Sequence, residues 1–195
     1  MSDIHDPGAT PEAMSIKKIG VIGAGQMGSG ISHVAAVAGI DVVMSDISQE
    51  QLDKAIATID RNLERQVQRE RISVTDKQDA LERLSGSTEY AALSECDIVI
   101  EAATENESVK REIYKAMIPS LRPDTIIASN TSSISITRLG ATTDRPERFM
   151  GMHFMNPVPI MQLVELIPGI ATDKATHKIV EGLTYRLGKT PGISE

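Results

Sequence analysis

Three glycines that directly follow a short apolar run constrain the fold of this chain more than any other feature. Residues 19–22 predict a strand and a helical pattern begins by Met27, so Gly23, Gly25 and Gly28 occupy the connecting turn in G-x-G-x-x-G spacing. Gly23 would allow a sharp turn, Gly25 would let the backbone approach a bound group, and Gly28 would let the helix pack close to the strand. The unpaired N–H groups at the start of such a helix favour a phosphate ligand.

The residues after this turn favour a dinucleotide site over an ordinary glycine-rich turn. A second apolar run, residues 40–44, follows the helix and leads to Asp46. A carboxylate at this distance from the glycines accepts hydrogen bonds from the adenosine ribose, although Asp46 could instead cap the helix that starts near Ser48. No arginine directly follows Asp46, which favours NAD over NADP. The expected cofactor contacts here are Gly23, Ala24, Gly25, Gln26, Met27, Gly28 and Asp46.

The composition is that of an acidic protein with an ordinary apolar content. With 195 residues, 41% of them apolar, the chain can form one domain with a buried core. A net charge of −7 argues against a nucleic-acid partner, so an anionic ligand would need a local basic patch. The single cysteine, Cys96, cannot form an internal disulfide and precedes an apolar run, which indicates a core residue in a reducing compartment.

The first residues resemble neither a signal peptide nor a membrane span. Residues 1–15 are polar and rich in proline, glycine, aspartate and threonine, and we expect them to form a disordered tail. No later segment is apolar enough to cross a bilayer, so we expect a cytoplasmic protein without a membrane partner. The folded domain is therefore expected to cover residues 16–195.

Apolar runs and helical patterns alternate along the domain, which predicts the α/β class and a Rossmann-type, doubly wound, mostly parallel sheet. Residues 48–84 interrupt this alternation with two helical patterns in succession, and predict a helical hairpin inserted between strands. Thr75 or Asp76 would cap its second helix, and Thr88 would lie in a short strand after it.

Three arginines repeat every four residues on the first helix of the hairpin, at positions 61, 65 and 69. Because this spacing places them on one face, they form a basic stripe. One interpretation is a solvated face balanced by Glu64 and Glu70. The other is a surface that meets a phosphorylated substrate, which would supply the basic patch that the acidic chain otherwise lacks.

Polar residues gather where two predicted strands end. Residues 97–103 and 125–129 read as buried strands without alternation, and residues 130–133 are polar. Ligands of open α/β sheets bind outside the carboxyl ends of the strands. We therefore expect Glu105, Lys110, Asn130 and Ser132 to lie on one rim of the sheet.

His153 is the candidate for chemistry. It lies in a predicted strand, a turn containing Pro157 and Pro159 follows, and Glu165 is central in the next strand. If the two strands are antiparallel, the carboxylate can hydrogen bond one imidazole nitrogen and prepare the other to take a proton from an alcohol. The alternative is a core histidine without a catalytic role. No cluster of histidine, cysteine and acidic residues has metal-ligand spacing, so we expect no metal.

Four blocks of sequence carry a family resemblance. Residues 23–28 (GAGQMG), 99–103 (VIEAA), 129–133 (SNTSS) and 153–158 (HFMNPV) make the chain resemble the 3-hydroxyacyl-CoA dehydrogenases, especially their bacterial 3-hydroxybutyryl-CoA dehydrogenase branch. The resemblance runs from about Ile16 to the end. It implies NAD as cofactor and the oxidation of a 3-hydroxyacyl-CoA, such as 3-hydroxybutyryl-CoA, to the 3-oxoacyl-CoA.

The resemblance also implies roles for single residues. His153 would be the acid/base, Glu165 would orient it, and Ser132 would contact both substrate and cofactor. The nicotinamide ribose end would be lined by Glu105, Lys110 and Asn156, with Asp46 at the adenosine end. Asn62 and Arg69 fall near the positions that contact coenzyme A in this family, which favours the substrate interpretation of the arginine stripe.

The chain departs from the family pattern in one respect. Members of the family continue beyond the strand near Lys189 into an all-helical second domain, which closes over the substrate and makes most of the homodimer contact. This chain would then be the cofactor-binding part, with low activity alone. A non-catalytic dinucleotide-binding module or sensor is the alternative, since the fold hosts many functions. Another β-hydroxyacid dehydrogenase is also possible, but would be expected to use a lysine base.

Overall fold

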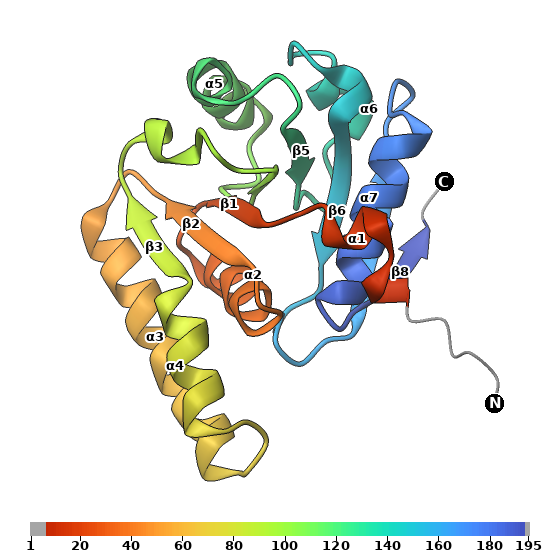
Figure 1. Cartoon of the computed structure of the whole chain (residues 1–195). Coiled ribbons are helices and arrows are strands. Elements are labelled where there is room, and N and C mark those ends of the chain that lie inside the picture. Colours follow the sequence, from red (N-terminus) through yellow and green to blue (C-terminus); the bar gives the residue numbers. More distant parts are fainter. Residues whose placement is uncertain (1–6, 194–195) are drawn as a thin grey trace, which may run out of the picture.

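In a computed structural model that describes residues 7–193, the chain forms one eight-stranded sheet with helices on both faces (Figure 1). The strands lie in the order β3-β2-β1-β4-β5-β6-β7-β8. Their bounds are β1 Lys18–Ile22, β2 Asp41–Ser45, β3 Leu84–Ser87, β4 Ile98–Glu101, β5 Ile126–Ser129, β6 Phe149–Phe154, β7 Leu163–Pro168 and β8 Thr190–Ile193. The predicted fold class, an α/β doubly wound and mostly parallel sheet, is confirmed.

The direction of the strands creates a crevice at one edge of the sheet. Strands β3 to β6 are parallel to one another, β7 is antiparallel to β6, and β8 is parallel to β7. Along the chain, β1 to β3 extend the sheet in one direction, and β4 to β8 extend it in the other. The loops that leave the neighbouring strands β1 and β4 therefore diverge. Such a switch point is where open α/β sheets bind ligands.

The helices form two layers, each with its own core. Helix α2 (Gln26–Val37), α3 (Gln49–Gln68), α4 (Val74–Glu82) and α7 (Lys174–Arg186) pack on one face, whereas α5 (Glu107–Met117) and α6 (Ile136–Gly140) pack on the other (Figure 1). The short helical elements are η1 Pro7–Ala9, α1 Pro11–Met14, η2 Tyr90–Leu93, η3 Ile118–Ser120 and η4 Pro146–Arg148. Both cores consist mainly of aliphatic side chains, in keeping with an aromatic content of only 3%.

The turn between β1 and α2 requires two of its glycines. Gly23 has a φ of +95°, which side chains rarely tolerate. A Cβ on Gly28 would lie 1.7 Å from the carbonyl oxygen of Gly23, so any side chain there would push the helix away from the strand. The two glycines therefore set how closely α2 approaches the carboxyl end of β1.

The predicted helical hairpin is present as α3 and α4, with different boundaries. Ser73 rather than Thr75 or Asp76 is the N-cap of α4, because its hydroxyl accepts a hydrogen bond from the Asp76 backbone and the Asp76 side chain reaches back to it. The chain leaves the helix early to pair with β2, so β3 ends at Ser87 and Thr88 lies outside it. Within the described residues, no helix is both long and apolar enough to span a membrane.

The expected disordered tail is wrong from Pro7 onward. Thr10 caps α1, and Ala13 is fully buried against Gly182 of α7. Arg186 of α7 donates a hydrogen bond of 2.6 Å to the carbonyl of Ile16. The polar composition of this segment did not indicate the contact, because it is held by one buried alanine against a glycine and by a hydrogen bond from a distant arginine. Residues 1–6 lie outside the described part of the chain.

Candidate functional site

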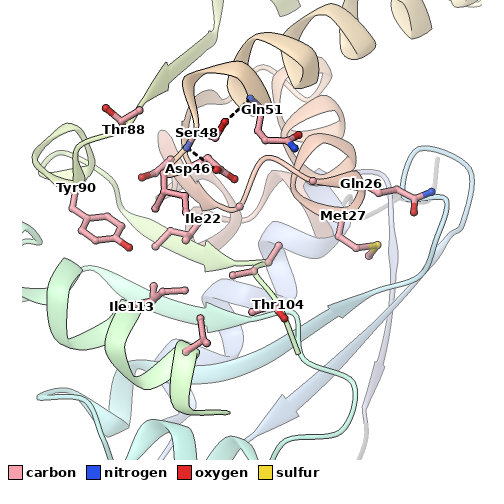
Figure 2. A pocket seen from close by; sticks show the side chains of 17 residues that line it. Ile22, Gln26, Met27, Asp46, Ser48, Gln51, Thr88, Tyr90, Thr104 and Ile113 are labelled. Carbon is pink, nitrogen blue, oxygen red and sulfur yellow. Dashed lines mark hydrogen bonds between the residues drawn. The ribbon is translucent and has the colours of Figure 1, made fainter. Parts of the chain in front are cut away.

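A cavity of about 820 Å³ opens at the carboxyl ends of β1, β2 and β4 (Figure 2). Its lining side chains come from the glycine turn, from the loop between β2 and α3, and from η2 and α5. Figure 2 shows Asp46, Ser48 and Gln51 on one wall and Ile113 and Tyr90 on another. The cavity therefore lies at the switch point of the sheet, and the loops that follow β1, β2 and β4 border it.

The glycine turn presents open backbone to this cavity. No heavy atom lies within 4 Å of the place where a Cβ of Gly25 would stand. Gly25 is the N-cap of α2 and offers no side-chain acceptor, so the first N–H groups of this 12-residue helix are free for a ligand. The residues present thus fit a pyrophosphate group at the start of α2.

Asp46 is fixed at the rim of the cavity by two backbone donors. Its Oδ2 accepts a hydrogen bond of 2.8 Å from the N–H of Ala24, and its Oδ1 accepts one of 3.0 Å from the N–H of Ser48. The alternative that Asp46 caps α3 is wrong, because Ser48 is the N-cap and accepts from the Gln51 N–H. Each carboxylate oxygen keeps a lone pair for a ribose hydroxyl.

The charge of the cavity agrees with an unphosphorylated ribose. Among the described residues that line it, none is a lysine or an arginine, and Asp46 is the only carboxylate. A 2′-phosphate next to Asp46 would meet a like charge without a counter-ion, whereas a 2′-hydroxyl can donate to it. The lining therefore fits NAD better than NADP.

His153 and Glu165 face each other across two neighbouring strands. They are direct partners in the antiparallel register of β6 and β7, and His153 Nδ1 lies 2.8 Å from Glu165 Oε2. The predicted pairing is confirmed. The imidazole is 19% exposed and lines a second cavity, of about 320 Å³, so it is not a buried core residue.

The second cavity adjoins the first. Met27, Ala102 and Ala103 line both, which places the histidine next to one end of the dinucleotide cavity. Its remaining lining residues are Glu105, Asn130, Ser132, Phe154, Met155 and Asn156. The sequence-predicted residues His153, Ser132, Glu105 and Asn156 are therefore brought together. Asn130, also expected on this rim, is used structurally, because its Oδ1 accepts the Phe154 N–H at 2.8 Å.

Glu105 holds the loop that carries Ser132. Its Oε1 accepts hydrogen bonds from the Ser132 N–H at 3.1 Å, the Ser133 N–H at 3.2 Å and the hydroxyl of Thr131. Partial burial opposes ionisation, but these hydrogen bonds and the nearby Lys110 ammonium outweigh it and hold the pKa of Glu105 below its usual range. Glu105 is thus an ionised anchor for the Ser132 loop.

Lys110 does not reach the rim where it was expected. It is 1% exposed, and its ammonium donates to both oxygens of Glu101 at 2.7 and 2.9 Å. Glu105 Oε2 lies 3.8 Å from the same ammonium. Lys110 therefore lies behind Glu105, as part of a buried network that the sequence analysis missed.

The centre of that network is Glu101, at the end of β4. Its carboxylate also accepts hydrogen bonds from the Tyr114 hydroxyl, the Ser129 hydroxyl and the Ala103 N–H, each at 2.8 Å. The three side chains that donate to it, those of Lys110, Tyr114 and Ser129, are all buried. The sequence could have indicated this network, because a glutamate at the end of a fully apolar strand needs buried hydrogen-bond partners.

The arginine stripe lies along α3 and its C-cap, Arg69, and none of its three arginines lines either cavity. Glu64, one of the expected balancing acids, is engaged by Lys77 of α4 at 2.7 Å. Within the described residues, neither Glu64 nor Glu70 forms an ion pair with an arginine of the stripe, and Arg65 and Arg69 are exposed. These guanidinium groups are therefore not neutralised by the two acids that were expected to balance them.

The fold and the site together define a dinucleotide-binding protein of the Rossmann type, with a histidine–carboxylate pair beside the cofactor cavity. Residues 18–193 match the family described as 3-hydroxyacyl-CoA dehydrogenase, NAD binding domain, and the chain belongs to this family. The predicted family and the predicted NAD cofactor are confirmed.

Relatives at high identity extend beyond this chain. It is 55% identical over 183 residues to a 3-hydroxybutyryl-CoA dehydrogenase of Bradyrhizobium diazoefficiens, covering 94% of the chain and 62% of the relative. A probable 3-hydroxybutyryl-CoA dehydrogenase of Bacillus subtilis is 44% identical over 177 residues, with 91% and 62% covered. The crystal structure of an (S)-3-hydroxybutyryl-CoA dehydrogenase from Ralstonia eutropha superposes with a TM-score of 0.89 at 50% identity, over 91% of this chain and 63% of that one.

Proposed function

We propose that this chain is the cofactor-binding part of an NAD-dependent 3-hydroxyacyl-CoA dehydrogenase, which oxidises 3-hydroxybutyryl-CoA to the 3-oxoacyl-CoA. The observation that carries the proposal is the hydrogen-bonded pair of His153 and Glu165 beside the dinucleotide cavity. A module that only binds NAD has no need of such a pair. The names of the relatives favour the short-chain substrate.

In the proposed reaction, His153 takes the proton of the 3-hydroxyl group while a hydride leaves C3, so the C3–O bond becomes a carbonyl. Bound NAD⁺ supplies the acceptor for that hydride. With Nδ1 held by Glu165, the Nε2 of His153 is left for the substrate, and the carboxylate stabilises the positive charge that the ring acquires. Atoms and charge balance, because one proton and one hydride leave the alcohol.

The other lining residues position the reactants. Ser132 would donate its hydroxyl to the substrate oxygen, and Asn156 would hydrogen bond the nicotinamide end of the cofactor. Glu105 would act on the Ser132 loop and reach the nicotinamide ribose. Lys110 would support Glu105 from behind. Asn62 of α3 and Arg69, the C-cap of that helix, would contact the coenzyme A portion of the substrate.

The test is oxidation of NADH by acetoacetyl-CoA, the reverse reaction. We expect low turnover from this chain, because its second cavity is open, and higher turnover from a longer protein of the relatives' length. We also expect that longer protein to be a homodimer through the part beyond this chain. Tight NADH binding without turnover by the longer protein would refute the dehydrogenase and leave a dinucleotide-binding module or sensor.

Replacing Asp46 by asparagine should weaken NADH binding. The change keeps the hydrogen bond from Ala24 available but removes the charged acceptor for the ribose, so we expect the Kd for NADH to rise by about 10- to 100-fold. Fluorescence titration measures this. Asp41→Asn, at the exposed other end of β2, is the matched control and should leave the Kd unchanged. An unchanged Kd in Asp46→Asn would remove Asp46 from the cofactor site.

Replacing Arg69 by glutamine should affect only substrates that carry the nucleotide part of coenzyme A. We expect the KM for acetoacetyl-CoA to rise about threefold to fivefold, as for an exposed ion pair, with the KM for acetoacetyl-pantetheine unchanged. The control is Lys54→Gln, an exposed cation on the same helix that pairs with Glu50. Equal changes for the two thioesters would mean that the stripe does not bind the nucleotide.

A further inference from the structure

Lys189 stands between α7 and β8 with its side chain turned into the protein. It is 6% exposed, and its ammonium donates to the carbonyl of Val158 at 2.6 Å and to the carbonyl of Met161 at 2.8 Å. Among the described residues, no carboxylate forms an ion pair with it. Both acceptors belong to residues 157–161, the turn that joins β6 to β7.

A buried ammonium without a counter-ion is unfavourable unless its hydrogen bonds compensate for the hydration that it loses. Burial lowers the pKa of Lys189 below its usual range. At the carboxyl end of α7, the backbone N–H of Lys189 donates to Thr184 O at 3.1 Å. The hydrogen bonds of its side chain do not go to the last carbonyl groups of that helix. Its ammonium instead binds a turn about 30 residues earlier in the chain.

This turn joins the two halves of the proposed catalytic pair. It begins directly after Asn156, follows the strand of His153 and leads into the strand of Glu165. Its Val158 is buried against α2, where a Cβ on Gly30 would lie only 2.8 Å from the Val158 Cβ. The turn therefore contacts the cofactor helix on one side and Lys189 on the other.

We propose that Lys189 is a positioning residue for the reaction: its ammonium clamps the 157–161 turn so that Asn156 faces the second cavity, beside His153, while Val158 stays docked on α2. The inference rests on the proposed function, because Asn156 matters only if a nicotinamide is bound beside it. It adds a link between the segment that leads into β8 and the residues at the reacting end of the cofactor.

The test replaces Lys189 by methionine, which has a similar length but no donor, and by alanine, which leaves room. A cavity of about 290 Å³ is lined by Lys189, Gly188, Pro159 and Gln162, so an added amine can reach the vacated place. Propylammonium can donate to the two carbonyls, whereas tetramethylammonium has the charge but no N–H. Lys178→Met, an exposed lysine on α7, is the matched control.

Two readouts are needed. The first is the NMR signal of the Asn156 side-chain amide, which reports the turn whether or not the chain turns over. The second is the Kd for NADH. We expect Lys189→Met to shift the Asn156 signal and raise the Kd by about tenfold, with the signals of β1 unchanged. In Lys189→Ala, propylammonium should restore both and tetramethylammonium neither.

Two outcomes would overturn the proposal. If the Asn156 signal stays in place in both variants, the clamp does not hold the turn. If signals change throughout the sheet and the amine restores nothing, Lys189 has only a general structural role. Absence of NADH binding by the unaltered chain would instead refute the proposed cofactor site, and the Asn156 signal would still decide the role of Lys189.

Discussion

Glutamine at position 153 is expected to lower the rate of acetoacetyl-CoA reduction by about 10²- to 10⁴-fold, the contribution that general acid–base catalysis makes. Glutamine keeps a polar side chain of similar size in β6, but it cannot carry a proton between the substrate oxygen and solvent. The dinucleotide cavity does not include His153 among its lining residues. We therefore expect the Kd for NADH to change by less than about twofold, since no cofactor contact worth measurable energy is lost.

The comparison variants make this expectation specific. His177→Gln alters another histidine, on α7, and should leave the rate unchanged. Glu165→Gln keeps a hydrogen-bond partner for the ring but removes the charge that stabilises its cationic form, so its rate should fall between those of the unaltered protein and His153→Gln. Stopped-flow measurement of NADH oxidation separates the chemical step from product release. An unaffected chemical step in His153→Gln would assign the proton transfer to another group.

The parts of this site that the sequence predicted depend on local chemistry. The glycine turn follows from spacing, since only glycine tolerates the φ of Gly23 and the contact at Gly28. The pairing of His153 with Glu165 follows from a short connection between two strands, which makes an antiparallel hairpin the simplest arrangement. Both inferences needed only residues close together in the chain.

The parts that the sequence did not predict depend on contacts between distant segments. The N-terminal helix is held by Arg186, which lies 170 residues from its acceptor Ile16. The ammonium of Lys189 reaches a turn 31 residues away. Lys110 was expected on the rim because it follows the carboxyl end of a predicted strand, but its place in the chain does not fix the depth at which a long side chain ends. Burial of the Glu101 carboxylate determined that depth, and no periodic pattern reports it.

That buried carboxylate gives the largest expected change in stability. Replacing Glu101 by glutamine keeps the shape and an acceptor for Tyr114 and Ser129. It removes the close counter-ion of the buried Lys110 ammonium and leaves only the partly exposed Glu105 carboxylate at 3.8 Å. We expect the free energy of unfolding to fall by about 3–5 kcal/mol, the range for breaking a buried ion pair from one side. Urea denaturation followed by circular dichroism measures it. Glu107→Gln, which breaks exposed pairs with Arg111 and Arg138, should have a much smaller effect.

A second substitution distinguishes an unpaired charge from a general loss of packing. In the double variant Glu101→Gln with Lys110→Met, no buried charge is left uncompensated, and methionine occupies a volume close to that of the lysine stem. We therefore expect the double variant to be more stable than Glu101→Gln alone, although each site was altered. If the two losses simply add, the ion pair is not the source of the effect. Because Lys110 also lies 3.8 Å from Glu105, which anchors the Ser132 loop, the double variant should recover stability but not turnover.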